Sequence, residues 1–208
     1  VDESLVREVT KDFDLPENVP MFLFVGRMMW YKNIKIILDA CKILKERGRD
    51  FRLLMLGIGP DEGAIKKYTA KLNLNDRVIY TGQLLDRSEL QIYYSTADLL
   101  VFPSMFDTNG LVVREAAASS TPSLLVEGSC AAEGITDCKT GFLCLETAHS
   151  VATSIDKIID NKDLLGRVGK NAQDDIYISW EDSIKNAYDR YQVVIDKFNS
   201  TPHGPYKY

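Results

Sequence analysis

A chain of 208 residues is long enough to bury a proper core, as one large α/β domain or two small ones. Hydrophobic residues make up 45% of it and charged residues 26%, which is the composition of an ordinary globular protein. The net charge of −5, without any basic block, argues against a general nucleic-acid-binding protein, so an anion site has to be local. We find no signal peptide and no apolar run approaching the roughly 20 residues of a membrane span.

The four cysteines do not suggest a metal site or a disulfide framework. Cys41, Cys130, Cys138 and Cys144 form no Cys-x-x-Cys pair, and no histidine lies at metal-ligand spacing from Cys130 or Cys138. We therefore expect free thiols in a reducing cytoplasm. Membrane association of the full-length protein stays open.

The first part of the chain predicts a strand, a helix and a second strand. Residues 1–20 are charged and end in L-P-E-N-V-P, which indicates a short helix or linker. The apolar run over 21–25 is typical of a buried parallel strand and stops at Gly26. Residues 34–47 have apolar side chains at helical spacing, and residues 52–56 predict the second strand.

The same alternation continues along the chain. The later predicted elements are a helix over 61–72, a strand over 77–81, a helix through Tyr94, a strand over 99–102, a helix over 111–118, a strand ending at Val126, a strand over 142–145, and helices over 147–161, 163–175 and 180–198. This order predicts an α/β fold: a Rossmann-like, doubly wound parallel sheet of about six strands with helices on both faces. We expect the domain to span 21–198 and a flexible tail to follow over 199–208.

The stretch over 99–126 is the most informative part of the sequence. A buried strand is followed by a polar loop that ends at Gly110, and then by an alanine-rich helix and a second strand. Ligands bind where the strand of such a βαβ unit meets its helix. Asp107 in the loop and Glu115 inside the helix are separated by seven residues. The N–H groups of Gly110 and Leu111 are expected to be unpaired donors of the helix N-terminus, which suits a phosphate.

Two cations follow the first strand in the loop G-R-M-M-W-Y-K. Arg27 and Lys32 can converge there on a diphosphate. The alternative for this pair taken alone is two solvated surface cations.

The G-I-G-P segment after the second strand is a weak dinucleotide-binding motif. The third glycine of G-x-G-x-x-G falls on Glu62, and no acid ends the second strand to hold a ribose. A tight loop beside a ligand pocket is the other interpretation.

Taken as a set, these motifs resemble the C-terminal, donor-binding domain of retaining GT-B glycosyltransferases, family 4, glycosyl transferases group 1. The resemblance covers nearly all of residues 10–198 and includes T-G-F-L before residue 144 and S-W-E at the start of the last helix. Two residues depart from the family pattern. Asp107 stands where glutamate is commoner, and Ser120 stands where glycine is usual, so we expect the turn after the helix to differ slightly.

The resemblance implies a role for each site residue. Arg27 and Lys32 would hold the donor phosphates, and Glu115 would accept hydrogen bonds from two ribose hydroxyl groups. Asp107 would accept hydrogen bonds from donor-sugar hydroxyls and stabilise positive charge at the anomeric carbon, while a role as nucleophile stays open. The predicted catalytic residues are Asp107, Arg27 and Lys32. The predicted donor-binding residues are Gly26, Arg27, Lys32, Gly57, Gln83, Leu84, Asp107, Asn109, Gly110, Leu111, Val112 and Glu115.

The function implied is the donor half of a hexosyltransferase. The donor would be a UDP-sugar, with GDP-mannose as the alternative, and the acceptor a glycan or lipid. No Asp-x-Asp ends a strand and the family is metal-independent, so no metal and no other cofactor is expected. Such an enzyme has two Rossmann-like domains and 208 residues accommodate one, so residues 1–20 would lead from a missing N-terminal domain and the chain alone would lack turnover. Two alternatives remain: a dinucleotide-binding oxidoreductase domain, or a non-catalytic nucleotide-sugar-binding module of the same fold.

Overall fold

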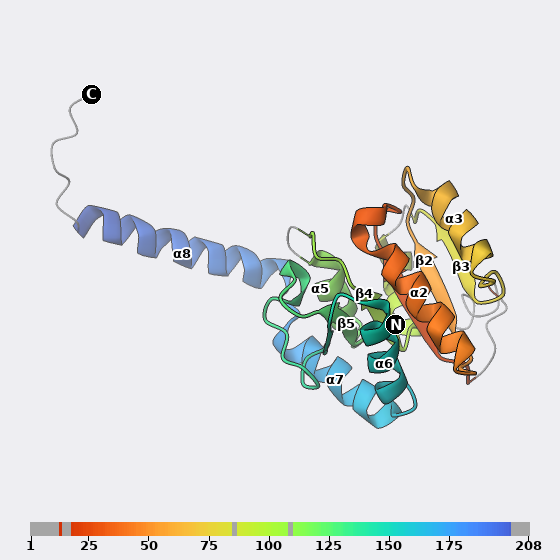
Figure 1. The fold of residues 1–208 in the computed structure, drawn as a ribbon. Coiled ribbons are helices and arrows are strands. Elements are labelled where there is room, and N and C mark those ends of the chain that lie inside the picture. The colour runs from red at the N-terminus through yellow and green to blue at the C-terminus, as the bar shows by residue number, and fades with distance from the viewer. Residues whose placement is uncertain (1–12, 14–17, 85–86, 108–109, 201–208) are drawn as a thin grey trace. The chain divides into compact units, whose positions relative to one another are not determined.

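The chain is divided into two units. The computed structural model describes residue 13 and residues 18–84, 87–107 and 110–200. The first unit covers residues 1–177 and contains the sheet with its helices, and the second covers residues 178–208 (Figure 1). The division at residue 177 lies inside the predicted domain of 21–198. Within the second unit, helix α8 (Trp180–Ser200) carries its large apolar side chains mostly three or four residues apart.

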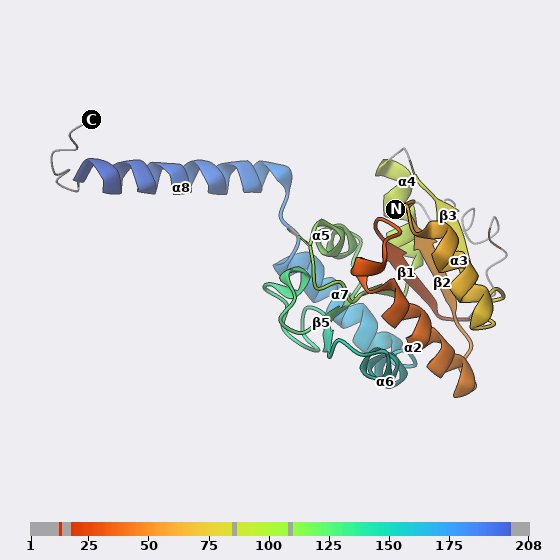
Figure 2. The same cartoon turned by 45° about the horizontal axis from the view of Figure 1, so that its top comes forward.

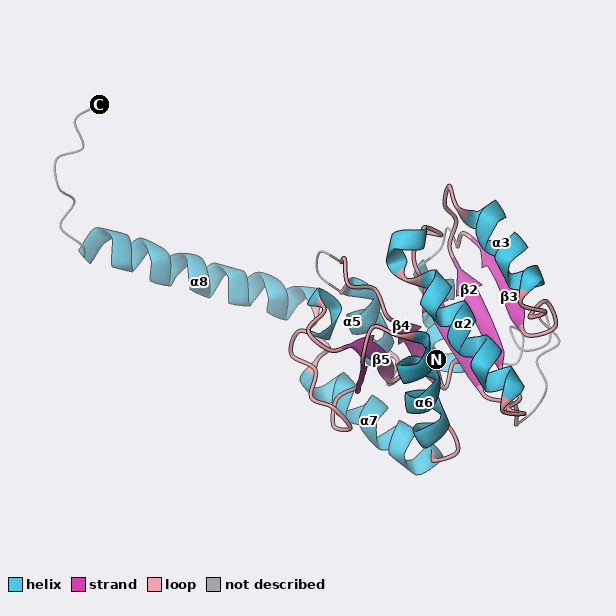
Figure 3. Cartoon of the chain, viewed as in Figure 1, coloured by secondary structure: helices cyan, strands magenta, loops and turns pink. Residues whose placement is uncertain are grey.

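The first unit is built on a six-stranded parallel sheet with the strand order β3-β2-β1-β4-β5-β6 (Figure 3). The strands are β1 (Met21–Val25), β2 (Arg52–Leu56), β3 (Val78–Gly82), β4 (Leu99–Phe102), β5 (Ser123–Val126) and β6 (Phe142–Cys144). All residues of β1, β4 and β5 are buried, because helices cover both faces of a parallel sheet and leave no solvent-facing side. The predicted Rossmann-like α/β fold is confirmed.

Helices cover both faces of the sheet. They are η1 (Trp30–Lys32), α2 (Ile34–Glu46), α3 (Glu62–Lys71), α4 (Arg87–Thr96), α5 (Leu111–Ala118), η2 (Cys130–Ala132), α6 (Ala148–Ile158) and α7 (Lys162–Asp175). Helix α2 contacts α3 and α6 on one face, while α5 contacts α4 and α7 on the other (Figure 2). The predicted helices and strands end within three residues of these bounds, and the two short 3₁₀ helices were not expected from the sequence.

The order of the strands reverses between β1 and β4. The chain leaves β1 toward β2 on one side and leaves β4 toward β5 on the other. Open α/β sheets bind ligands at such a reversal, at the carboxyl edge of the sheet. We use the word crevice for the region between the loops after β1 and β4. The β1–α2 and β4–α5 loops, which carry the predicted site residues, meet at this point.

Two glycines let the loop after β2 pack directly on the loop after β1. A Cβ atom at Gly57 would lie 2.0 Å from the carbonyl oxygen of Gly26, and one at Gly59 would lie 2.4 Å from that of Met28. The amide of Met28 also donates to the carbonyl oxygen of Ile58 at 3.1 Å. The G-I-G segment thus has a structural reason to contain glycine that does not depend on a dinucleotide.

All four cysteines are free, as the sequence predicts. Cys41 and Cys144 are buried, and this burial raises the pKa of each thiol to about 12, so both stay protonated at neutral pH. They behave as small core residues. Cys130 and Cys138 are exposed.

Ser120, at the position where we expect an altered turn, has a φ of 57°. This left-handed conformation costs a residue with a Cβ atom about 1–2 kcal/mol, a cost that glycine avoids. We expect Ser120→Gly to raise the free energy of unfolding by about 1 kcal/mol, measured by urea denaturation. Ala118→Gly, two residues earlier in α5, is the control and should lower it by about the same amount. Equal changes of the same sign in both variants would contradict the prediction.

Candidate functional site

The loop after β1 is held against the loops after β4 and β6 by one asparagine. Asn33 adopts a φ of 58° between η1 and α2. Its side-chain amide donates to the carbonyl oxygen of Pro103 at 2.9 Å and to Oε1 of Glu146 at 2.8 Å. Asparagine tolerates the left-handed conformation better than most residues, which explains why the loop can turn here without glycine. Asn33 thereby fixes the position of the preceding Lys32.

Lys32 lies across the crevice between β1 and β4. Its Nζ atom donates to the carbonyl oxygen of Phe106 at 2.9 Å and to Oδ2 of Asp107 at 3.0 Å. The ammonium group also lies 5.6 Å from the centre of the Phe102 ring. The two partners are largely withdrawn from solvent, since the side chain of Lys32 is 12% exposed and that of Asp107 is 17% exposed. The structure thus brings together two of the three predicted catalytic residues, from positions 75 residues apart.

Asp107 also bonds to the backbone directly before α5. Its Oδ1 atom accepts a hydrogen bond from the backbone N–H of Gly110 at 3.2 Å. The prediction that the Gly110 N–H is an unpaired donor is therefore wrong: a short acidic side chain three residues earlier bonds to it. Of the two N–H donors predicted for a phosphate, only that of Leu111 has no acceptor among the described residues. The N–H group of Val112, which is not one of the two, also has none there.

Gly110 fits the close packing of α5 against η2. Its φ is 55°, and a Cβ atom there would lie 3.2 Å from Cα of Ala131. A side chain at this position would be strained and would push α5 away from η2. Gly110 therefore fixes the place at which the N-terminus of α5 opens onto the crevice.

Glu115 lies one turn inside α5 and has a partner that sequence reasoning missed. The hydroxyl group of Tyr94, on α4, donates to Oε2 of Glu115 at 3.0 Å. Burial raises the pKa of Tyr94 well above its ordinary value, and the negative charge of Glu115 raises it further. The phenol therefore stays protonated and serves as a hydrogen-bond donor. Among the described residues, Oε1 of Glu115 has no hydrogen-bond partner.

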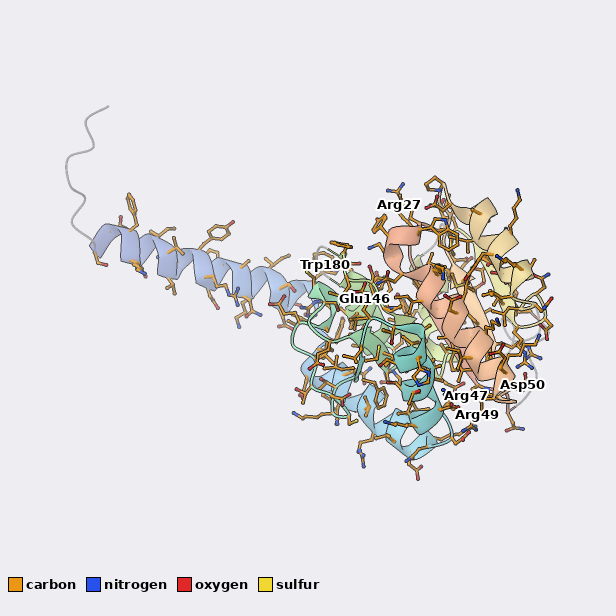
Figure 4. The ribbon with its side chains drawn as sticks, viewed as in Figure 1. Arg27, Arg47, Arg49, Asp50, Glu146 and Trp180 are labelled. Carbon is orange, nitrogen blue, oxygen red and sulfur yellow. The ribbon has the colours of Figure 1, made fainter. Side chains whose placement is uncertain are left out.

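The remaining predicted residues follow other strands or precede Lys32 along the same edge of the sheet. Arg27 follows β1 and is exposed, at the end of α2 opposite Arg47, Arg49 and Asp50 (Figure 4). Gly26 and Gly57 pack on each other. Gln83 and Leu84 follow β3, two strands from β1, which places them roughly 10 Å along the edge. Asn109 lies outside the described residues.

Two of the residues that shape the site carried little signal in the sequence. Asn33 precedes α2 as an ordinary loop residue, and a left-handed asparagine at a helix start is recognisable only once the dihedral angle is known. Tyr94 lies in a predicted helix, but nothing in the spacing links it to Glu115, 21 residues later. The sequence shows only that Tyr94 lies shortly before the predicted strand over 99–102, which leads into the loop of the site.

The arrangement combines groups of opposite character within one crevice. A lysine and the first N–H groups of α5 can hold an anion, and a carboxylate one turn further can accept hydrogen bonds from hydroxyl groups. A phosphorylated polyhydroxyl compound satisfies both requirements. None of the described residues form a cluster of three or more His, Cys, Asp or Glu side chains suited to a metal ion, and the expectation that no metal is needed stays a prediction.

Comparison with known proteins identifies the family to which the chain belongs. A family model described as Glycosyl transferases group 1 matches residues 6–175. The chain belongs to this family. Among curated relatives, a protein of Methanocaldococcus jannaschii described as an uncharacterized glycosyltransferase is 24% identical to this chain over 189 residues. The aligned region covers 89% of this chain and 48% of that protein. The chain thus spans about half the length of this curated relative.

Solved structures agree with the fold. A glycosyltransferase from Rickettsia africae superposes with a TM-score of 0.82 at 22% identity, covering 94% of this chain and 53% of that one. Anabaena HepE, described in complex with UDP and glucose, superposes with a TM-score of 0.73 at 19% identity, covering 83% of this chain and 47% of that one. These likenesses show that the chain shares their fold. In the part of the chain that the structure describes, no helix is both long and apolar enough to cross a membrane.

Proposed function

We propose that this glycosyl transferases group 1 chain is the donor-binding, C-terminal domain of a retaining, family 4 glycosyltransferase. The donor is a nucleoside diphosphate sugar, UDP-sugar first and GDP-mannose as the alternative, from which a hexose passes to a glycan or lipid acceptor. The observation that carries the proposal is the meeting of Lys32 and Asp107 across the β1–β4 crevice, directly before the N-terminus of α5.

The diphosphate is assigned to the cationic part of the crevice. When the bond between sugar and diphosphate breaks, negative charge grows on the phosphate oxygens, and fixed donors aimed at them lower the barrier, often by about 3 kcal/mol for one donor. Lys32 and the N–H groups of Leu111 and Val112 are the candidates in the crevice, and Arg27 is an exposed cation at its rim. Asp107 pairs with Lys32, so a diphosphate would compete with this carboxylate for the ammonium group.

The arrangement around Asp107 favours a positioning role over that of a nucleophile. One of its oxygens accepts from Lys32 and the other from the backbone of Gly110. Both contacts lower the electron density available for attack and fix the carboxylate in place. In our proposal Asp107 orients the donor sugar through its hydroxyl groups and stabilises positive charge at the anomeric carbon. The departing phosphate would then take the proton of the acceptor on the same face.

The rest of the assignment follows the carboxyl edge of the sheet. Glu115 accepts from the ribose hydroxyl groups, and the backbone near Gln83 and Leu84 contacts the base. The distance of roughly 10 Å between β3 and β1 suits the length of a nucleotide. We assign acceptor binding and turnover to a second domain. In this proposal the protein lies in the cytoplasm, and the transfer requires no metal ion.

Family membership disfavours the oxidoreductase alternative, and the packing of Gly57 and Gly59 gives the glycine pair another explanation. A non-catalytic module of the same fold would bind the same nucleotide, so turnover in a longer protein that contains this chain separates it from the proposal. The acid pair Asp107 and Glu115 favours a working donor site over such a module.

Calorimetric titration of the chain with UDP, GDP, ADP and NAD tests the proposal. We expect one nucleoside diphosphate to bind with micromolar to millimolar affinity. Glu115→Ala should weaken that affinity about tenfold, because it removes charge-assisted hydrogen bonds to the ribose. Glu46→Ala, which removes an exposed carboxylate at the end of α2, is the matched control and should bind as the wild type does.

Two results would count against the proposal. Binding of NAD in preference to all three diphosphates would favour the oxidoreductase alternative. Undiminished binding by Glu115→Ala would remove Glu115 from the ribose site. The arginine at the rim is tested in the same way with Arg27→Ala, for which we also expect weaker binding.

A further inference from the structure

Tyr94 is a buried residue whose hydroxyl group reaches the half-buried Glu115. Its side chain is 1% exposed and belongs to the core beneath α4 and α5. A buried hydroxyl group is normally used to satisfy a polar partner, because an unpaired one costs free energy. Here the partner is Oε2 of Glu115, at 3.0 Å. The core thus supplies one hydrogen bond to the ligand-facing edge.

A second hydrogen bond fixes the backbone of the same tyrosine. Oγ1 of Thr121 donates to the carbonyl oxygen of Tyr94 at 2.6 Å, and Thr121 is itself 2% exposed. Thr121 lies between α5 and β5, so both bonds tie Tyr94 to the segment that carries Glu115. Packing, the backbone bond and the hydroxyl bond leave the Tyr94 ring one position, and the hydroxyl is therefore a fixed reference point for the carboxylate.

The consequence for Glu115 is that its two oxygens differ. Oε2 is held by Tyr94, whereas Oε1 has no partner among the described residues. Glutamate loses considerable side-chain entropy when a ligand immobilises it. A carboxylate that is already held at one oxygen loses less, and it presents the other oxygen in a constant direction.

We propose that Tyr94 is a positioning residue for Glu115: its hydroxyl holds one carboxylate oxygen so that the carboxylate is preset to receive the hydroxyl groups of a bound ribose. The inference rests on the proposed function, since it assigns the ribose to Glu115. It adds a residue that never touches the ligand and yet affects recognition of the ligand's hydroxyl groups.

Tyr94→Phe tests this inference in the 208-residue chain. The probes are the nucleoside diphosphate that binds the wild type most tightly and its 2′,3′-dideoxy analogue. We expect the affinity for the ribonucleotide to fall about fivefold, and the affinity for the dideoxy analogue to stay the same. A general loosening of the fold would weaken both nucleotides equally, so the ratio of the two affinities identifies a positioning role.

Tyr68→Phe is the matched control. It removes another tyrosine hydroxyl that donates to a carboxylate, Oδ1 of Asp39, at 2.6 Å, in a part-buried bond between α3 and α2. It should leave the ratio of affinities at the wild-type value. Thr121→Val is a second variant, which releases the Tyr94 backbone and should lower the ratio about twofold.

The outcomes separate this inference from the proposed function. A wild type that binds no nucleoside diphosphate, or that does not prefer the ribonucleotide, overturns the proposed ribose site and this inference with it. In the other case the wild type prefers the ribonucleotide, Glu115→Ala loses that preference and Tyr94→Phe keeps it. This result leaves the proposed function in place and overturns only the role of Tyr94.

Discussion

Gly169→Ala is expected to lower the free energy of unfolding by about 3 kcal/mol, although alanine is the better helix former. Gly169 lies in α7, where it packs on the turn after α5. A Cβ atom at this position would lie 1.9 Å from the carbonyl oxygen of Ser120 and 3.2 Å from Cδ of Pro122. The atom in closest contact is backbone and cannot rotate away, so α7 would have to move outward from α5.

Gly166→Ala is the matched control, one turn earlier in the same helix. A Cβ atom there meets nothing within 4 Å, and Gly166 is exposed. The same substitution should therefore raise the free energy of unfolding by about 0.5–1 kcal/mol, through helix propensity alone. Urea denaturation of both variants measures the two changes. Stabilisation by Gly169→Ala as well would show that α7 does not pack on the Ser120 turn as described.

This pair of glycines illustrates what the sequence could reveal about the fold. The apolar runs of β1 and β4, in alternation with amphipathic helices, were sufficient to predict a doubly wound parallel sheet. Both glycines in α7 look alike in such a pattern, since each lies in a helical stretch. Only the structure distinguishes them, because the approach of one helix to a neighbouring turn depends on how the helices pack.

The boundary between α6 and α7 shows a similar limit. The helix predicted over 147–161 ends at Ile158, and Asn161 accepts a hydrogen bond from the N–H of Leu164 as the N-cap of the next helix. The side chain of Asn161 begins α7, while α6 ends three residues earlier. The sequence predicted a break between the two helices and the end of α7 at Asp175, but it placed the end of α6 three residues too late.

For the site, the sequence predicted the edge and some of its residues. Parallel strands end at a common edge, so Lys32 and Asp107 could be expected near each other from the topology alone. The loss of the Gly110 N–H to Asp107 could also have been foreseen, since loop aspartates commonly accept a hydrogen bond from a nearby backbone N–H. The bond between Tyr94 and Glu115 could not, because it depends on the rotation of α4 and α5 about their axes.

Lys32→Ala is expected to raise the dissociation constant for the preferred nucleoside diphosphate about 30-fold, equivalent to about 2 kcal/mol. The side chain of Lys32 is 12% exposed and its ammonium group lies between the β1 and β4 loops, where a contact with phosphate is little screened by solvent. The corresponding nucleoside, which has no phosphate, should bind the variant and the wild type equally. Isothermal titration with both ligands measures the difference.

Two further variants isolate the charge of Lys32 from its packing. Lys32→Met keeps the apolar part of the side chain beside the Phe102 ring and should lose as much diphosphate affinity as Lys32→Ala. Lys35 is the second residue of α2, pairs with Asp39 and is 60% exposed, and Lys35→Ala should bind as the wild type does. If Lys32→Met binds the diphosphate within threefold of the wild type, the ammonium group does not hold the phosphate. Lys32 would then serve only to join the two loops, through Asp107 and the carbonyl oxygen of Phe106.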